Sequence, residues 1–234
     1  MTATVTEPQC FRVEVSAELG SVSSLLQRPA DAHSLFVLAH GAGADMHHGT
    51  MGAIADALAH HGVATFRYQF PYSEQGRRAP NRRAQLIETV RAAVDEASDH
   101  AGELPLLAGG KSMGGRMTSL AQAEKELPGV RGLVFFGFPL HAAGRPSRER
   151  GAHLDHVALP MLFLQGARDR LASLELLRPL CRELGRRASL HVGEDADHSF
   201  HVLKRTARSD EEVLDELARE VALFAGQAGK SVSG

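Results

Sequence analysis

A chain of 234 residues, 43% of them hydrophobic, is long enough for one α/β domain with a sizeable core and too short for two comfortable ones. The 26 basic and 28 acidic residues leave a net charge of −2, which argues against nucleic acid or a membrane surface as a partner. No apolar run approaches the ~18 residues of a membrane span. Residues 1–9 lack the features of a signal peptide, so we expect a cytoplasmic protein.

Strands and helices alternate along the predicted chain. In order, they are strands at 11–15, 21–27 and 34–39, a helix at 50–61, a strand at 63–70, a helix at 81–97, a strand at 104–108, a helix at 114–126, strands at 132–136 and 161–164, a helix at 173–184, a strand at 189–192 and a helix at 210–225. This alternation predicts an α/β fold with a mainly parallel central sheet and helices on both faces. We expect a single domain over 10–225, with disordered tails at 1–9 and 226–234.

The most informative segment follows the apolar run at 104–108. Gly110-Lys111-Ser112-Met113-Gly114 fits G-x-S-x-G, and a predicted helix comes directly after it. Strand, tight turn and helix in this order make a nucleophile elbow, in which the serine has a strained backbone and small neighbours let strand and helix approach closely. The segment therefore predicts a serine hydrolase with Ser112 as the nucleophile.

Gly110-Lys111-Ser112 also matches the end of the phosphate-binding loop G-x-x-x-x-G-K-[ST], which makes a nucleotide-binding protein an alternative. The first glycine of that motif would fall at Pro105, which has no N–H to offer a phosphate. The pattern therefore favours the elbow.

A serine hydroxyl needs a base and a group that orients the base. His198 and Asp169 each lie just after a later predicted strand, in the chain order nucleophile, acid, histidine. Loops after parallel strands meet at one edge of the sheet, so we expect both side chains near Ser112. Asp155, Asp195 and Asp197 are alternative carboxylates in nearby loops.

The oxyanion of an acyl-transfer intermediate needs two N–H donors. His40-Gly-Ala-Gly-Ala44 follows the strand at 34–39, and its small residues leave the backbone accessible. We assign the Ala42 N–H as one donor, with Ala44 as the alternative, and the Met113 N–H as the other.

Several residues near the predicted site have open roles. Tyr72 and His141 are candidate substrate-binding residues. Residues 138–160 are too few for a helical lid, which predicts an open, shallow site. A basic cluster consists of Arg77, Arg78, Arg82 and Arg83. We interpret it as a solvent-exposed face or, alternatively, as a binding site for a substrate carboxylate or phosphate. His198 and His201 with Asp195 or Asp197 have a spacing that could mimic a metal site, but we expect no metal and no other cofactor.

These motifs resemble the α/β-hydrolase superfamily, and more narrowly the small bacterial dienelactone-hydrolase-like group. The strings that carry the resemblance are His40-Gly-Ala-Gly-Ala, Gly109-Gly-Lys-Ser-Met-Gly-Gly-Arg116, Gly166-Ala-Arg-Asp169 and Asp197-His198-Ser-Phe. They are also similar to the hydrolase-like domain of a subunit of an animal histone-acetyltransferase complex. Typical dienelactone hydrolases have a cysteine nucleophile, whereas position 112 here is serine.

Together these patterns predict a carboxylic-ester hydrolase that cleaves small esters or thioesters through an acyl-enzyme on Ser112. The expected partner is a small-molecule ester. The alternative is a catalytically quiet hydrolase-like protein used for interaction. The patterns leave the natural substrate, the leaving-group atom and the oligomeric state open.

Overall fold

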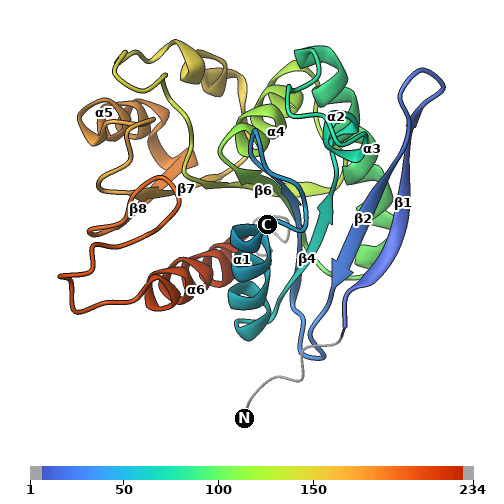
Figure 1. The fold of residues 1–234 in the computed structure, drawn as a ribbon, viewed down its shortest axis with the longest axis horizontal. Coiled ribbons are helices and arrows are strands. Elements are labelled where there is room, and N and C mark those ends of the chain that lie inside the picture. The colour runs from blue at the N-terminus through green and yellow to red at the C-terminus, as the bar shows by residue number, and fades with distance from the viewer. Residues whose placement is uncertain (1–6, 229–234) are drawn as a thin grey trace.

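Eight strands form one sheet through the middle of the protein, as the computed structural model shows for residues 7–228 (Figure 1). The strands are β1 (Gln9–Ser16), β2 (Gly20–Gln27), β3 (Ser34–Ala39), β4 (Val63–Tyr68), β5 (Leu106–Lys111), β6 (Val130–Phe136), β7 (Met161–Gly166) and β8 (Ala188–Gly193). They lie in the order β1-β2-β4-β3-β5-β6-β7-β8. β2 pairs antiparallel with β1 and with β4, and every other pair is parallel. The predicted mainly parallel sheet is confirmed.

Helices cover both faces of this sheet (Figure 1). They are α1 (Gly49–His60), α2 (Pro71–Glu74), α3 (Arg83–Ala101), α4 (Met113–Glu124), α5 (Leu174–Leu184) and α6 (Asp210–Ala228), with 3₁₀ helices η1 (Glu149–His156) and η2 (Gly185–Arg187). In β3, Leu35 and Val37 pack in the core that contains α3, α4 and α5. Phe36 and Leu38 pack in the core that contains α1 and α6. A strand that is buried on both faces has apolar residues at consecutive positions, which is why the sequence predicts the strand at 34–39.

The ends of strands β5 and β4 differ from the prediction. β5 continues through Gly109 and Gly110 to Lys111, although glycine weakens a strand by its flexibility. A Cβ on Gly109 would lie 1.9 Å from the Val134 carbonyl oxygen, so the glycine is needed for the close approach of β5 to β6. β4 ends at Tyr68, short of the predicted residue 70, because Pro71 begins the short helix α2.

The segment between β6 and β7 contains only η1 as a helix. Leu140 and Leu154 of this segment are buried in the core beside α4, and His153 reaches Ser119 of α4. The segment is therefore packed onto the body of the protein, and residues 7–228 contain no substantial lid.

The predicted tails at 1–9 and 226–234 fall mostly outside the described residues. Where they overlap with the description, Gln9 is the first residue of β1 and residues 226–228 belong to α6. No helix within 7–228 combines the length and hydropathy needed to cross a bilayer.

Candidate active site

Ser112 lies in the turn between β5 and α4. Its backbone has a φ of 52° and a ψ of −117°, in a region that residues with a side chain rarely adopt. Its N–H donates to the Phe136 carbonyl oxygen at 3.1 Å, which ties the turn to the end of β6. The strained turn holds the serine side chain at the carboxyl edge of the sheet.

The glycines on either side of Ser112 permit this turn. A Cβ on Gly110 would lie 2.3 Å from the carbonyl oxygen of Ala39, and a Cβ on Gly114 would lie 2.5 Å from the same oxygen. Both distances are far below a van der Waals contact. Glycine is therefore required at both ends of G-x-S-x-G because β5 and α4 approach the end of β3 so closely.

The loop after β8 brings His198 to Ser112. The imidazole Nε2 lies 2.9 Å from the Ser112 Oγ, and Nδ1 lies 2.6 Å from Oδ2 of Asp169. The loop seats closely on β7, because a Cβ on Gly166 would lie 2.4 Å from the Asp197 carbonyl oxygen. Hydroxyl, imidazole and carboxylate thus form one hydrogen-bonded chain.

The carboxylate of Asp169 is fully buried, and both of its oxygens have hydrogen-bond partners. Its Oδ1 accepts the Leu171 N–H at 2.7 Å, and its Oδ2 accepts from the Gln165 side chain as well as facing His198. These donors fix the carboxylate beside the imidazole. Sequence reasoning did not single out Gln165, since only its distance from Asp169 in space reveals the contact.

The alternative carboxylates have other surroundings. Asp197 accepts the N–H groups of Ser199 and His201 and so shapes the loop that carries His198. Asp195 accepts a hydrogen bond from Arg168 at its backbone carbonyl, and Asp155 lies exposed in η1. The structure therefore brings Asp169, and not these three, to the imidazole.

The segment after β3 forms a turn against the elbow, and residues 41–44 are called the oxyanion loop below. The Gly41 carbonyl oxygen accepts hydrogen bonds from His40 Nδ1 at 2.9 Å, from the Ala44 N–H at 3.3 Å and from the Tyr72 hydroxyl at 3.4 Å. Within residues 7–228, the N–H groups of Ala42 and Met113 donate to no protein acceptor. Ala44 is thus engaged inside the turn, whereas Ala42 and Met113 keep a donor available.

A small cavity of about 210 Å³ opens between the oxyanion loop and the Ser112–His198 pair. It is lined by Gly41, Ala42, Gly43, Ala44, His48, Thr50, Met51, Lys111, Ser112, His198 and Ser199. Neither Tyr72 nor His141 belongs to this lining, although both were candidate substrate-binding residues.

Tyr72 and His141 are both buried. Burial raises the pKa of the Tyr72 hydroxyl, which supports the oxyanion loop from below through Gly41. The His141 Nε2 accepts the Ser173 N–H at 3.0 Å, and its Nδ1 donates to the Ala142 carbonyl oxygen at 2.9 Å. In this structure both side chains hold loops, and substrate contact by either remains a prediction.

Sequence reasoning missed two buried polar residues beside the site, His40 and Lys111. Burial lowers the pKa of His40 to about 4, and burial lowers the pKa of Lys111 to about 8. The only sequence feature that could have pointed to them is their position inside or next to glycine-rich turns. Only tertiary structure shows that these polar side chains point inward.

The remaining polar candidates lie apart from the chain of contacts. Arg77, Arg78, Arg82 and Arg83 are all exposed, around the start of α3. His201 Nδ1 lies 2.6 Å from Asp210 Oδ2, so its ring has a partner of its own. No group of three potential metal ligands occurs in the part of the chain that the structure describes.

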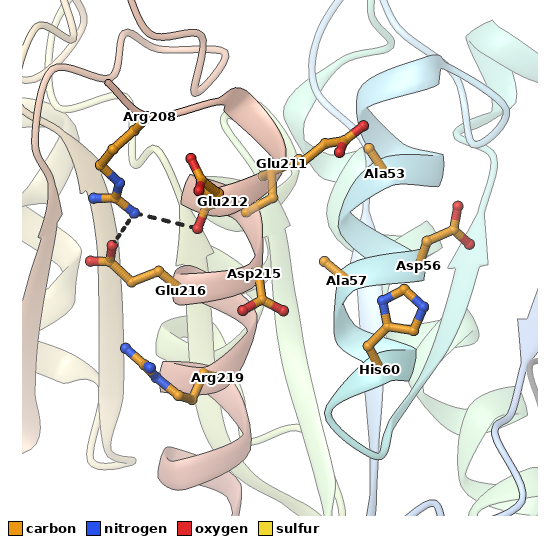
Figure 2. A pocket seen from close by; sticks show the side chains of 11 residues that line it. Ala53, Asp56, Ala57, His60, Arg208, Glu211, Glu212, Asp215, Glu216 and Arg219 are labelled. Carbon is orange, nitrogen blue, oxygen red and sulfur yellow. Dashed lines mark hydrogen bonds and ion pairs between the residues drawn. The ribbon is translucent and has the colours of Figure 1, made fainter. Parts of the chain in front are cut away.

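A larger hollow, of about 750 Å³, lies between α1 and α6 (Figure 2). Three of the carboxylates around it have partners: Glu216 with Arg208 and His191, Asp215 with His61, and Asp56 with Gln27. Neither Ser112 nor His198 lines it. Size alone does not make this hollow the reactive site.

The strained serine between a parallel strand and a helix, joined to a histidine and a buried aspartate from later strand ends, defines the α/β-hydrolase class of fold. The chain belongs to the alpha/beta hydrolase domain family, whose model matches residues 32–226.

Solved structures agree with this fold. A dienelactone hydrolase from Anabaena variabilis is 21% identical, with a TM-score of 0.73 over 95% of this chain and 99% of that one. An α/β serine hydrolase homologue from Coxiella burnetii is 19% identical, with a TM-score of 0.71 over 96% and 99% of the two chains. A Xanthomonas campestris α/β serine hydrolase without lid is 19% identical, with a TM-score of 0.69 over 98% of each chain.

Proposed function

We propose that the protein is a serine hydrolase that cleaves small carboxylic esters or thioesters through an acyl-enzyme on Ser112. One observation carries the proposal: Ser112 Oγ lies 2.9 Å from His198 Nε2, and His198 Nδ1 lies 2.6 Å from the buried carboxylate of Asp169. A serine hydroxyl becomes a competent nucleophile near neutral pH only with such a base at hand.

In the first half of the reaction, Ser112 Oγ attacks the substrate carbonyl carbon while His198 Nε2 takes the hydroxyl proton. The Asp169 carboxylate holds the proton of the ring on Nδ1, so that Nε2 is free to accept. The N–H groups of Ala42 and Met113 donate hydrogen bonds to the negative oxygen of the tetrahedral intermediate. Collapse of the intermediate breaks the bond to the leaving group, which takes the proton from His198.

In the second half, a water molecule attacks the acyl carbon on Ser112 and gives a proton to His198 Nε2. The second intermediate collapses to the carboxylic acid and returns the proton to Ser112 Oγ. Water is the second substrate, and the steps call for no metal or organic cofactor.

The size of the cavity supports small substrates. Its volume of about 210 Å³ lies below the ~300–1,000 Å³ of drug-sized ligand sites. Since η1 and its flanking segment pack beside α4, no helical cap within residues 7–228 extends the cavity into an apolar tunnel. Short acyl groups fit this space.

Labelling with a fluorophosphonate probe tests the proposal. The wild-type protein and the variant S98A are expected to be labelled, because Ser98 lies on α3 and donates only to the Val94 carbonyl oxygen. S112A is expected to be unlabelled and to lose turnover of p-nitrophenyl acetate. Absence of labelling in the folded wild-type protein would instead favour the alternative, a catalytically quiet interaction protein.

A further inference from the structure

Lys111 is a buried lysine with no assigned role, and it directly precedes Ser112. It is 7% exposed at the end of β5. Its Nζ is buried and makes no hydrogen bond within residues 7–228. The ammonium lies 5.5 Å from the centroid of the Phe200 ring, a cation–π distance. An unpaired buried charge is costly, so its position calls for an electrostatic partner.

The Lys111 ammonium and the His198 imidazole both lie close to Gly137. A Cβ built on Gly137 would be 3.2 Å from Lys111 Nζ and 3.3 Å from both Cε1 and Nδ1 of the His198 ring. Both groups therefore border the same small space. The φ of 70° at Gly137 disfavours a side chain there, and an added Cβ would be in tight contact with both groups.

Titratable groups from three loops border this position. Asp169 and Asp197 attract the ammonium and partly offset the burial that lowers the pKa of Lys111 to about 8. His198 lies beside it, and His48 lines the same cavity from the start of α1. Below about pH 8 the ammonium is therefore charged, opposite in sign to the Asp169 carboxylate.

The charge balance of the site depends on this lysine. A buried carboxylate favours the charged, doubly protonated form of a neighbouring histidine. A histidine that already holds a proton on Nε2 cannot take the proton of Ser112. A cation close to the ring opposes that protonation, because like charges repel.

We propose that the Lys111 ammonium is a positioning residue of the reaction, whose charge offsets that of Asp169 and keeps the His198 imidazole neutral and able to accept the Ser112 proton. The inference rests on the proposed hydrolase function. Lys111 acts through His198 and touches no reacting atom.

Three lysine variants separate charge from packing. K111M removes the charge and keeps much of the chain length, and K111R keeps the charge. K125M makes the same change as K111M at the exposed C-terminal end of α4. For each, kcat/KM for p-nitrophenyl acetate is measured from about pH 5 to about pH 8, the range in which an unperturbed histidine titrates. If K111M does not fold, K111Q replaces it as the neutral variant.

The acid limb of the kcat/KM profile is expected to move to higher pH by about one unit in K111M. It is expected to stay at the wild-type position in K111R and K125M. An unmoved limb in K111M, even with a lower rate at every pH, overturns the proposal and leaves Lys111 a packing residue. An equal shift in K111R overturns it as well.

NMR titration of the His198 ring in wild-type and K111M protein gives the same comparison without turnover. A shifted midpoint of the ring signals supports the inference, and an unchanged midpoint overturns it. A wild-type protein without labelling or turnover would refute the proposed function, whereas the NMR comparison would still decide the role of Lys111.

Discussion

The Nδ1–H of His40 donates to the carbonyl oxygen of Gly41, 2.9 Å away. The other ring nitrogen, Nε2, accepts the Phe70 N–H at 3.2 Å. Since a backbone N–H can only donate, the ring proton is on Nδ1. This buried ring connects the oxyanion loop to the residue before α2 through its bonds to Gly41 and Phe70. Within residues 7–228, the Ala42 N–H, unlike that of Ala44, thereby stays free to donate into the cavity.

Replacement of His40 by leucine is therefore expected to lower kcat for p-nitrophenyl acetate by about 10²-fold with a smaller change in KM. The loss is on the order of that for one oxyanion donor, because the loop that presents Ala42 loses its anchor. H60A, an exposed histidine at the end of α1, is the control. An unchanged kcat in a folded H40L would contradict the anchoring role.

Protein stability is expected to decrease between about pH 6.5 and about pH 4. Burial lowers the pKa of His40 from 6.5 to about 4, so in this window the unfolded chain binds a proton that the folded protein refuses. The loss is about 2 kcal/mol at pH 5 relative to pH 7. Burial, followed by Arg116, lowers the pKa of His153 to about 4, which acts in the same direction.

Urea unfolding of wild-type and H40L protein at both pH values measures this contribution. The decrease from neutral to acid pH is expected to be smaller in H40L by about 2 kcal/mol, whereas H60A should retain the wild-type decrease. Equal decreases in wild-type and H40L would show that His40 is not the group responsible.

The elbow glycines should not tolerate a methyl group. G110A and G114A each place a Cβ within 2.5 Å of the Ala39 carbonyl oxygen, so β5 or α4 must move. We expect both variants to lose fluorophosphonate labelling and to unfold at lower urea concentrations. G52A, in α1 with no atom within 4 Å of the added Cβ, should instead gain about 0.5–1 kcal/mol. Normal labelling of G110A would argue against the close packing of the elbow.

Asp169→Asn is expected to reduce kcat by on the order of 10⁴, the size of effect seen when the acid of a serine protease triad becomes an amide. The amide no longer stabilises the imidazolium and favours the wrong tautomer of His198. D155N, an exposed change of the same kind in η1, should keep wild-type kinetics. Both are compared by kcat with p-nitrophenyl acetate, and equal kcat values would exclude Asp169 as the acid.

Acyl-chain preference should follow the small cavity. We expect kcat/KM for p-nitrophenyl esters to fall about tenfold or more from acetate to octanoate. Met51 lines the cavity, and M51A should raise the octanoate-to-acetate ratio of kcat/KM by enlarging it. The ratio is used because it is insensitive to a general loss of folded protein. A wild-type preference for octanoate would contradict the proposed short-chain specificity.

Local patterns in the sequence determined the fold class and the expected positions of the catalytic candidates. The apolar run at 34–39 and the periodicities of the helices are legible because burial on two faces, or on one helical face, dictates which residues are apolar. G-x-S-x-G predicts the elbow because backbone approach admits only glycine at those places. His198 and Asp169 followed from the rule that loops after parallel strands share an edge.

The sequence favoured Asp169 over Asp155, Asp195 and Asp197, and the tertiary structure decided between them by placing Asp169 against His198. The tertiary structure also decided that Tyr72 and His141 are buried and that His40 and Lys111 point inward beside the reacting groups. No periodic pattern in the sequence indicates the direction of a polar side chain in a loop, because that direction depends on contacts between segments far apart in sequence. Such contacts, as between Lys111 and the loop that carries His198, exist only once the sheet has brought its strand ends together.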